Sequence, residues 1–138
     1  MEGRAGRPPP LPAHHEPIGR SPPLGGGAGD DGVPGYYSIG IRTYTSSIAT
    51  VAPKLSLELH EAAATADAAR LAQLMHDYVL PLYAIRARRK GYEVSVMKEM
   101  MNQLGMAAGP VRARLVQVAP EDKAQITKIL EKWKPVLG

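Results

Sequence analysis

The chain contains no cysteine and no phenylalanine, and its single tryptophan is Trp133. Without cysteine there can be no disulfide bonds, no thiolate nucleophile and no zinc site with cysteine ligands. Without phenylalanine, a core must be packed mainly by leucine, isoleucine, valine, methionine and alanine. A length of 138 residues allows one domain at most.

Long apolar runs are also missing. None approaches the ~20 residues that span a bilayer, and residues 1–10 lack the apolar segment of a secretory signal. We therefore expect a cytoplasmic protein that has no membrane partner. The net charge of +4 divides into −1 for residues 1–35, where three arginines stand against four carboxylates, and +5 for the remainder. This moderate basic excess points toward anionic ligands.

Residues 1–35 are rich in proline and glycine. They hold 8 of the 13 prolines and 9 of the 14 glycines, and few large apolar side chains. Such a segment cannot offset its own conformational entropy, so we predict a disordered leader over this range. His14, His15 and Glu16 are of metal-ligating types but have no scaffold to fix them. Residues 25–27 lack the Lys-Ser/Thr of a phosphate-binding loop and are interpreted as linker. We expect no cofactor and no metal site.

The best strand signal is residues 41–46, where β-branched and aromatic residues are concentrated. Nothing else in the chain looks like a partner for this strand. Because backbone N–H and C=O groups must be paired or hydrated, we expect another chain, or a missing part of this one, to complete the sheet.

Periodicity predicts four helices and no further strand. Pro53 suits the first position of a helix that runs to about residue 64. Asp67 can cap a long helix, which Pro81 should bend near residues 77–81. A third helix is expected over residues 93–104, and a final one begins near residue 120.

The long helix ends in a basic cluster, Arg86, Arg88, Arg89 and Lys90. Cations in a last turn complement the helix dipole. The alternative is a nucleic-acid patch flanked by Tyr83 and Tyr92. We favour the explanation that these cations complement the helix dipole, and we expect no nucleic-acid partner.

Four motifs carry a resemblance. They are residues 42–54 (RTYTSSIATVAPK), 79–82 (VLPL), 89–98 (RKGYEVSVMK) and 109–112 (GPVR). In this order and spacing, the chain from about residue 36 to 137 resembles the C-terminal part of the dihydrodipicolinate synthase family. Within the family, it is most similar to the branch that dehydrates and decarboxylates 5-dehydro-4-deoxyglucarate to 2,5-dioxopentanoate.

The resemblance implies a mostly α-helical C-terminal fragment of a (βα)8 TIM barrel. Residues 36–66 would supply the last barrel strand and helix, and residues 67–138 a C-terminal helical extension. A complete barrel needs ~250 residues. In this family a sixth-strand lysine forms a Schiff base with a small 2-oxo sugar acid, and a fifth-strand tyrosine relays protons. No lysine of this chain stands in that position, so we expect no catalytic residue and no activity from the chain alone. A homo-oligomer is a further expectation.

Active sites of this fold lie at the carboxyl ends of the strands. We therefore predict that Thr45, Ser46 and Ser47 bind a substrate carboxylate, although they could equally be small residues that fit a tight barrel wall. The sequence departs from the family at residues 65–67, where Thr-Ala-Asp replaces a more usual Gly-Asp turn. It departs again at Ala113 and Arg114, where prolines are commoner.

A non-catalytic helical interaction module is the alternative function. In that case the apolar faces that once covered a barrel would bind a partner. The leucines that carry this hypothesis are Leu55, Leu59, Leu71 and Leu74.

Overall fold

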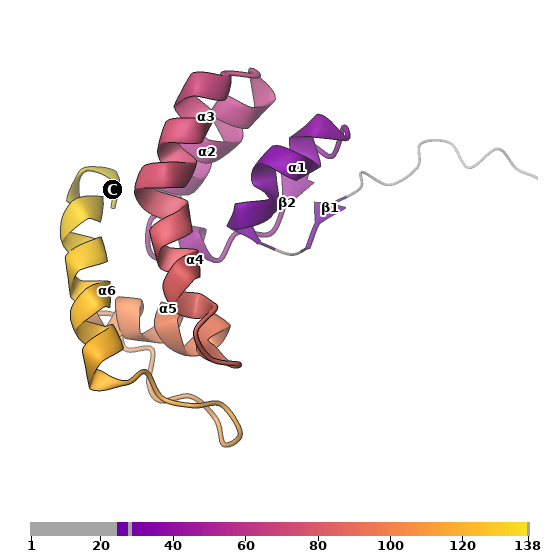
Figure 1. Cartoon of the computed structure of the whole chain (residues 1–138). Coiled ribbons are helices and arrows are strands. Elements are labelled where there is room, and N and C mark those ends of the chain that lie inside the picture. Colours follow the sequence, from indigo (N-terminus) through magenta and orange to yellow (C-terminus); the bar gives the residue numbers. More distant parts are fainter. Residues whose placement is uncertain (1–24, 28, 138) are drawn as a thin grey trace, which may run out of the picture.

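The computed structural model describes residues 25–27 and 29–137, and this part of the chain is mostly helical (Figure 1). Most of the predicted leader, including His14, His15 and Glu16, lies outside the described residues. In chain order the elements are β1 (Gly25–Gly26), the 3₁₀ helix η1 (Asp30–Gly32), α1 (Val33–Ser38), β2 (Thr43–Tyr44), the 3₁₀ helix η2 (Ile48–Thr50), α2 (Pro53–Ala64), α3 (Ala68–Leu74), the π-helix η3 (Met75–Val79), α4 (Leu80–Arg86), α5 (Tyr92–Gln103), α6 (Pro120–Trp133) and the 3₁₀ helix η4 (Lys134–Val136). No helix in the described ranges has the length and apolar character to cross a membrane.

The predicted strand has a partner within the chain, so the expectation of a lone strand is wrong. β2 pairs in parallel with β1, with Gly25 opposite Thr43 and Gly26 opposite Tyr44. α1 lies between the two strands in sequence, which makes a strand–helix–strand unit. The strand is also shorter than residues 41–46, because only Thr43 and Tyr44 have strand geometry.

Steric crowding explains why β1 has a glycine at position 26. A Cβ at Gly26 would lie 2.5 Å from two ring atoms of Tyr36 on α1, closer than side-chain contacts allow. The strand therefore uses a residue with poor strand propensity because the Tyr36 ring packs directly on its backbone. Residues 25–27 are thus not merely linker, and the predicted leader boundary at residue 35 falls inside α1, where Val33 is fully buried.

The predicted helix that starts at Pro53 is confirmed as α2, with proline in its first turn. Leu55 and Leu59 of α2 and Leu74 of α3 are fully buried, and Leu71 is partly buried. These leucines pack within the chain's own core, so they do not form the wet apolar faces on which the interaction-module hypothesis depends.

The predicted long helix is divided into α3, η3 and α4. Asp67 caps it as predicted, since its carboxylate accepts a hydrogen bond from the Arg70 N–H at 3.0 Å. The irregularity expected near residues 77–81 takes the form of a π-helix immediately before Pro81. Proline cannot donate its backbone N–H to the preceding turn, and a wider turn relieves that conflict.

A polar clamp fixes α6 against the α4–α5 connection, on the side of the α3–α4 column away from α1 and the strands (Figure 1). Asp122 in the first turn of α6 forms an ion pair with Arg88 and accepts a hydrogen bond from the Tyr92 hydroxyl at 2.9 Å. The same hydroxyl accepts from the Ala119 N–H at 3.0 Å. Donation by Tyr92, followed by the Arg88 contact, lowers the pKa of the Asp122 carboxyl below its usual value.

Candidate functional site

A buried carboxylate lies where the two parallel strands end. Asp30 follows β1 and is fully buried. Its carboxylate accepts hydrogen bonds from the Ser47 N–H and the Ser47 hydroxyl, both at 3.1 Å, and from the Ile48 N–H at 3.2 Å. The Ser46 hydroxyl donates to its other oxygen. Asp30 therefore holds the turn between β2 and α2 in place.

Two residues of α4 complete this cluster, which we call the Asp30 cluster: Asp30, Ser46, Ser47, Tyr83 and Arg86. The Tyr83 hydroxyl accepts from the Asp30 N–H at 2.8 Å and donates to the Asp30 carboxylate at 3.3 Å. Arg86 donates through Nη1 to the Ser47 hydroxyl at 2.8 Å, and its Cζ lies 4.4 Å from the centroid of the Tyr83 ring. The helices after residue 67 are thus coupled to the strand ends.

Burial raises the pKa of two tyrosines around this cluster. Desolvation raises the pKa of Tyr83, and the negative charge of Asp30 raises it further. Desolvation also raises the pKa of Tyr44, whose hydroxyl donates to the Ser56 carbonyl at 3.2 Å. Both hydroxyls therefore keep their protons near neutral pH and act as hydrogen-bond donors.

The predicted substrate-binding residues lie together at the carboxyl end of β2, but two of them already have partners. Ser46 and Ser47 donate to Asp30, whereas Thr45 is exposed and donates its N–H to the Gly26 carbonyl at 2.9 Å. Sequence reasoning missed Asp30, Tyr83 and Arg86 because 53 residues separate Asp30 from Tyr83. The one sequence feature that could have indicated Asp30 is its position directly after the glycine-rich residues 25–29.

A hollow of 240 Å³ is lined by residues of β2, of the turn after it and of α2. We call its lining the β2–α2 surface, and it consists of Arg42, Thr43, Tyr44, Ser46, Ser56, Leu57 and His60. His60 is hydrogen-bonded to the Tyr37 hydroxyl, which itself donates to the Arg42 carbonyl at 3.1 Å. Arg42 donates back to the Tyr37 carbonyl at 2.7 Å.

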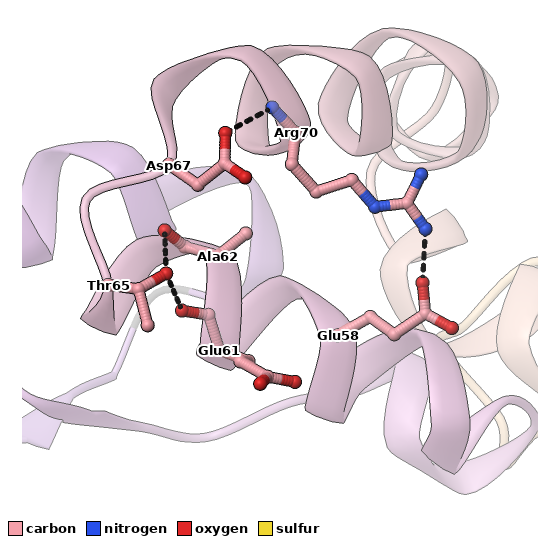
Figure 2. Close-up of a pocket in the computed structure, with 6 residues that line it drawn as sticks. All are labelled: Glu58, Glu61, Ala62, Thr65, Asp67 and Arg70. Atoms are coloured by element: carbon pink, nitrogen blue, oxygen red, sulfur yellow. Dashed lines mark hydrogen bonds and ion pairs between the residues drawn. The ribbon is translucent and has the colours of Figure 1, made fainter.

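A second hollow, of 290 Å³, lies between α2 and α3 and is polar (Figure 2). Glu58 forms an ion pair with Arg70 at 2.5 Å, Asp67 caps α3, and the Thr65 hydroxyl donates to the Glu61 carbonyl at 2.8 Å. These interactions are structural. No group of three or more histidines, aspartates and glutamates within the described ranges could hold a metal ion.

The lysines are exposed or only partly buried. All of them lie in the described part of the chain: Lys54, Lys90, Lys98, Lys123, Lys128, Lys132 and Lys134. None is buried, and the most enclosed, Lys98, donates to the carbonyls of Ala108 at 3.0 Å and Pro110 at 2.9 Å. A Schiff-base lysine needs a desolvated amine or a neighbouring cation, and no lysine here has a desolvated amine.

The basic helix end predicted from the sequence is largely engaged within the chain. Arg86 joins the Asp30 cluster, Arg88 pairs with Asp122, and the Arg89 Cζ lies 5.9 Å from the centroid of the Tyr92 ring. Arg86 and Arg88 are therefore bonded to side chains of the chain itself, whereas Arg89 and Lys90 remain exposed.

Known proteins resemble this chain in sequence and in structure. Among curated proteins, the probable 5-dehydro-4-deoxyglucarate dehydratase of Ralstonia nicotianae is 37% identical over 95 residues, which are 69% of this chain and 30% of the relative. The one of Azotobacter vinelandii is 34% identical over 100 residues, 72% of this chain and 33% of the relative. The chain therefore spans about a third of the length of the curated relatives it matches.

The solved structures of two enzymes resemble the fold of this chain. The dihydrodipicolinate synthase from Bacillus clausii matches with a TM-score of 0.71 and 28% identity, over 78% of this chain and 37% of that chain. The Proteus mirabilis N-acetylneuraminate lyase matches with a TM-score of 0.61 and 26% identity, over 80% of this chain and 35% of that chain. A sequence model described as the dihydrodipicolinate synthetase family matches residues 24–133, so the chain belongs to this family.

Proposed function

We propose that this chain is the C-terminal part of a class I aldolase-like lyase barrel that dehydrates and decarboxylates 5-dehydro-4-deoxyglucarate, and that it has no activity by itself. The observation that carries the proposal is the parallel β1–α1–β2 unit, whose residues lie within the family match over residues 24–133. The alignments with the curated relatives cover only about a third of their length. Repeating units of this kind build a (βα)8 barrel, which needs ~250 residues.

The structure suggests a division of the chain that begins earlier than the sequence predicted. β1 and α1 would be the last but one strand and helix of the barrel, and β2 and α2 the last. The part from residue 67 onward would be the helical extension. Support comes from the order of the elements and from the parallel pairing of the two strands. We extend the proposal to a role in glucarate catabolism, on the names of the relatives, and to the cytoplasmic location expected from the sequence.

The chemistry would require a lysine from outside this chain. In the proposed reaction the lysine amine attacks the 2-oxo carbonyl of the substrate and water leaves as the imine forms. A proton on the carbon next to the imine and the hydroxyl group on the following carbon would then leave as water, which gives a conjugated imine. This conjugated imine would accept the electron pair released when the distal carboxyl group leaves as carbon dioxide. Hydrolysis of the imine would return the lysine amine and release 2,5-dioxopentanoate. Such an amine must be desolvated or close to another cation, and each lysine here is exposed or bound to backbone carbonyls.

The contribution of this chain would be one wall of the substrate pocket. Thr45, Ser46 and Ser47 follow β2 at the end of the strands where this fold binds its substrates. Asp30 would act as a positioning residue, since it holds the backbone of Ser47 and Ile48. Thr45, which is exposed and does not bond to Asp30, is the best placed of the three to meet a substrate carboxylate.

The test is turnover by the purified chain. Incubated with 5-dehydro-4-deoxyglucarate, it should release neither carbon dioxide nor 2,5-dioxopentanoate, whereas the full-length Ralstonia relative assayed in parallel serves as the positive control. Product formation by the 138-residue chain, abolished when Lys98 is replaced by alanine, would overturn the proposal.

A further inference from the structure

We propose that a hollow between η3, α4 and α6 binds an amino dicarboxylate, a small molecule that carries one ammonium group and two carboxylates. This inference is independent of the proposed lyase reaction and concerns the helices that follow residue 67. It rests on two adjoining hollows, on hydrogen-bonding groups that are unused at their walls, and on the balance of charge.

The first observation is the space where α6 packs against η3 and α4 (Figure 1). A hollow of 370 Å³ is lined by residues of η3, by Pro81 of α4 and by Lys132 of α6. A second hollow, of 70 Å³, shares Asp77, Pro81 and Lys132 with the first and extends to Lys128 and Trp133. Because three residues line both, the two form one site, which we call the η3–α6 hollow. The larger part alone has the volume of a small-molecule site.

The second observation is a group of unused donors on α6. Lys128 and Lys132 lie one turn apart on the same face of the helix. Neither forms an ion pair within the described residues, and two like charges at this spacing repel each other. Trp133 is fully buried, and its indole N–H has no acceptor in the described part of the chain. Carboxylates in the hollow would neutralise the lysines and accept hydrogen bonds from donors of this kind.

The third observation is a pair of acceptors on η3. Pro81 has no backbone N–H, and the Leu80 N–H donates to the Met75 carbonyl in the π-helical pattern. The residues four and five positions after His76 therefore donate nothing to the His76 carbonyl, which points along the helix axis toward Pro81. One oxygen of the Asp77 carboxylate lies 2.9 Å from Nδ1 of His76, and the other bonds to no described residue. An ammonium group would use both acceptors, and π-helical turns are frequent at functional sites.

The balance of charge favours one class of ligand. Two lysines and one aspartate give the lining one net positive charge when His76 is neutral. A simple anion would be repelled by the Asp77 carboxylate, and a simple amine would be repelled by both lysines. An amino dicarboxylate carries one net negative charge, with an ammonium group for Asp77 and a carboxylate for each lysine.

The experiment uses the fluorescence of Trp133, which is the only tryptophan of the chain and lines the hollow. Titration with L-glutamate should change its emission saturably, with a dissociation constant below about 1 mM. Glutarate has both carboxylates but no amine, so it should bind at least about tenfold more weakly. Asp77→Asn should abolish this preference for L-glutamate over glutarate, because it removes the charge that pairs with the amine.

Lys132→Ala should weaken L-glutamate binding at least about tenfold, because Lys132 lines both parts of the hollow. Lys134→Ala is the matched control, since Lys134 is exposed in η4 and lines neither part. It should change the affinity less than about twofold.

Circular dichroism of each variant establishes that it folds. The inference is overturned if L-glutamate neither changes the Trp133 emission nor gives heat in a calorimetric titration. It is also overturned if Lys132→Ala and Lys134→Ala have equal effects, or if glutarate binds the wild-type chain as tightly as L-glutamate does.

Discussion

The pairing of β1 with β2 can be tested by adding a single methyl group at Gly26. An alanine Cβ there would lie 2.5 Å from the Cδ2 and Cε2 atoms of Tyr36 and 2.7 Å from its Cζ, whereas ordinary contacts begin at 3.4 Å. The Tyr36 ring must therefore move by about 1 Å or rotate away from the core, and overpacking of this kind costs about 1–3 kcal/mol. We expect Gly26→Ala to lower the free energy of unfolding by this amount.

Gly25→Ala is the matched control. Its Cβ would meet only the Thr43 hydroxyl oxygen, at 3.7 Å, which is an ordinary contact. Because alanine also restricts the unfolded chain more than glycine does, this variant should be neutral or stabilising by up to about 1 kcal/mol.

Urea denaturation of both variants, followed by circular dichroism, gives the difference in unfolding free energy. A double-mutant cycle with Tyr36→Ala should show that most of the loss at Gly26 depends on the Tyr36 ring. Equal stability of Gly26→Ala and Gly25→Ala would refute the packing of α1 on β1, and with it the strand–helix–strand unit.

Three further predictions concern the turn at Ala66, the Asp30 cluster and the Asp122 clamp. Ala66 has a φ of +57°. Because this conformation costs an L-residue about 1–2 kcal/mol, Ala66→Gly should stabilise the fold by about 0.5–1 kcal/mol. Ala64→Gly, at the last residue of α2, should instead destabilise it, by less than about 1 kcal/mol, in the same denaturation assay. Asp30→Asn should cost at least about 2 kcal/mol, because buried donors lose a charged acceptor. It should also lower the pKa of Tyr83, read by tyrosinate absorbance, and an unchanged titration would contradict the contact between Asp30 and Tyr83. The pKa of Asp122 is lowered in the folded chain, so its stabilising effect is present above the ordinary value of 3.8 and is lost as the pH falls through the folded value. Tyr92→Phe should therefore raise the Asp122 pKa in an NMR titration, and the stability difference from wild type should shrink in acid; a pH-independent difference would contradict the clamp.

The sequence predicted the features that depend on local chemistry. Pro53 begins α2, and Asp67 caps α3. Each of these depends on the conformational preference of one residue or on a hydrogen bond to a near neighbour. The position of the irregularity before Pro81 was predictable for the same reason, although its form, a π-helix, was not.

Features that depend on contacts between distant residues could not be predicted. β1 consists of two glycines, which have almost no strand propensity, and Gly26 is required there because the Tyr36 ring occupies the space that a side chain would need. Asp30 is buried because its donors come from segments 16 to 53 residues away. The family resemblance predicted Thr45, Ser46 and Ser47 as substrate-binding residues, whereas only the structure revealed that two of them are bonded to Asp30.

The central claim is that this chain contributes a wall of a lyase barrel and not its nucleophile. The most direct measurement is borohydride reduction of the purified chain in the presence of 5-dehydro-4-deoxyglucarate, followed by intact mass analysis, with the full-length Ralstonia relative treated in the same way. We predict that the chain keeps its unmodified mass while the relative gains a reduced substrate adduct. A stable adduct on a lysine of this chain, present only with substrate, would contradict the account.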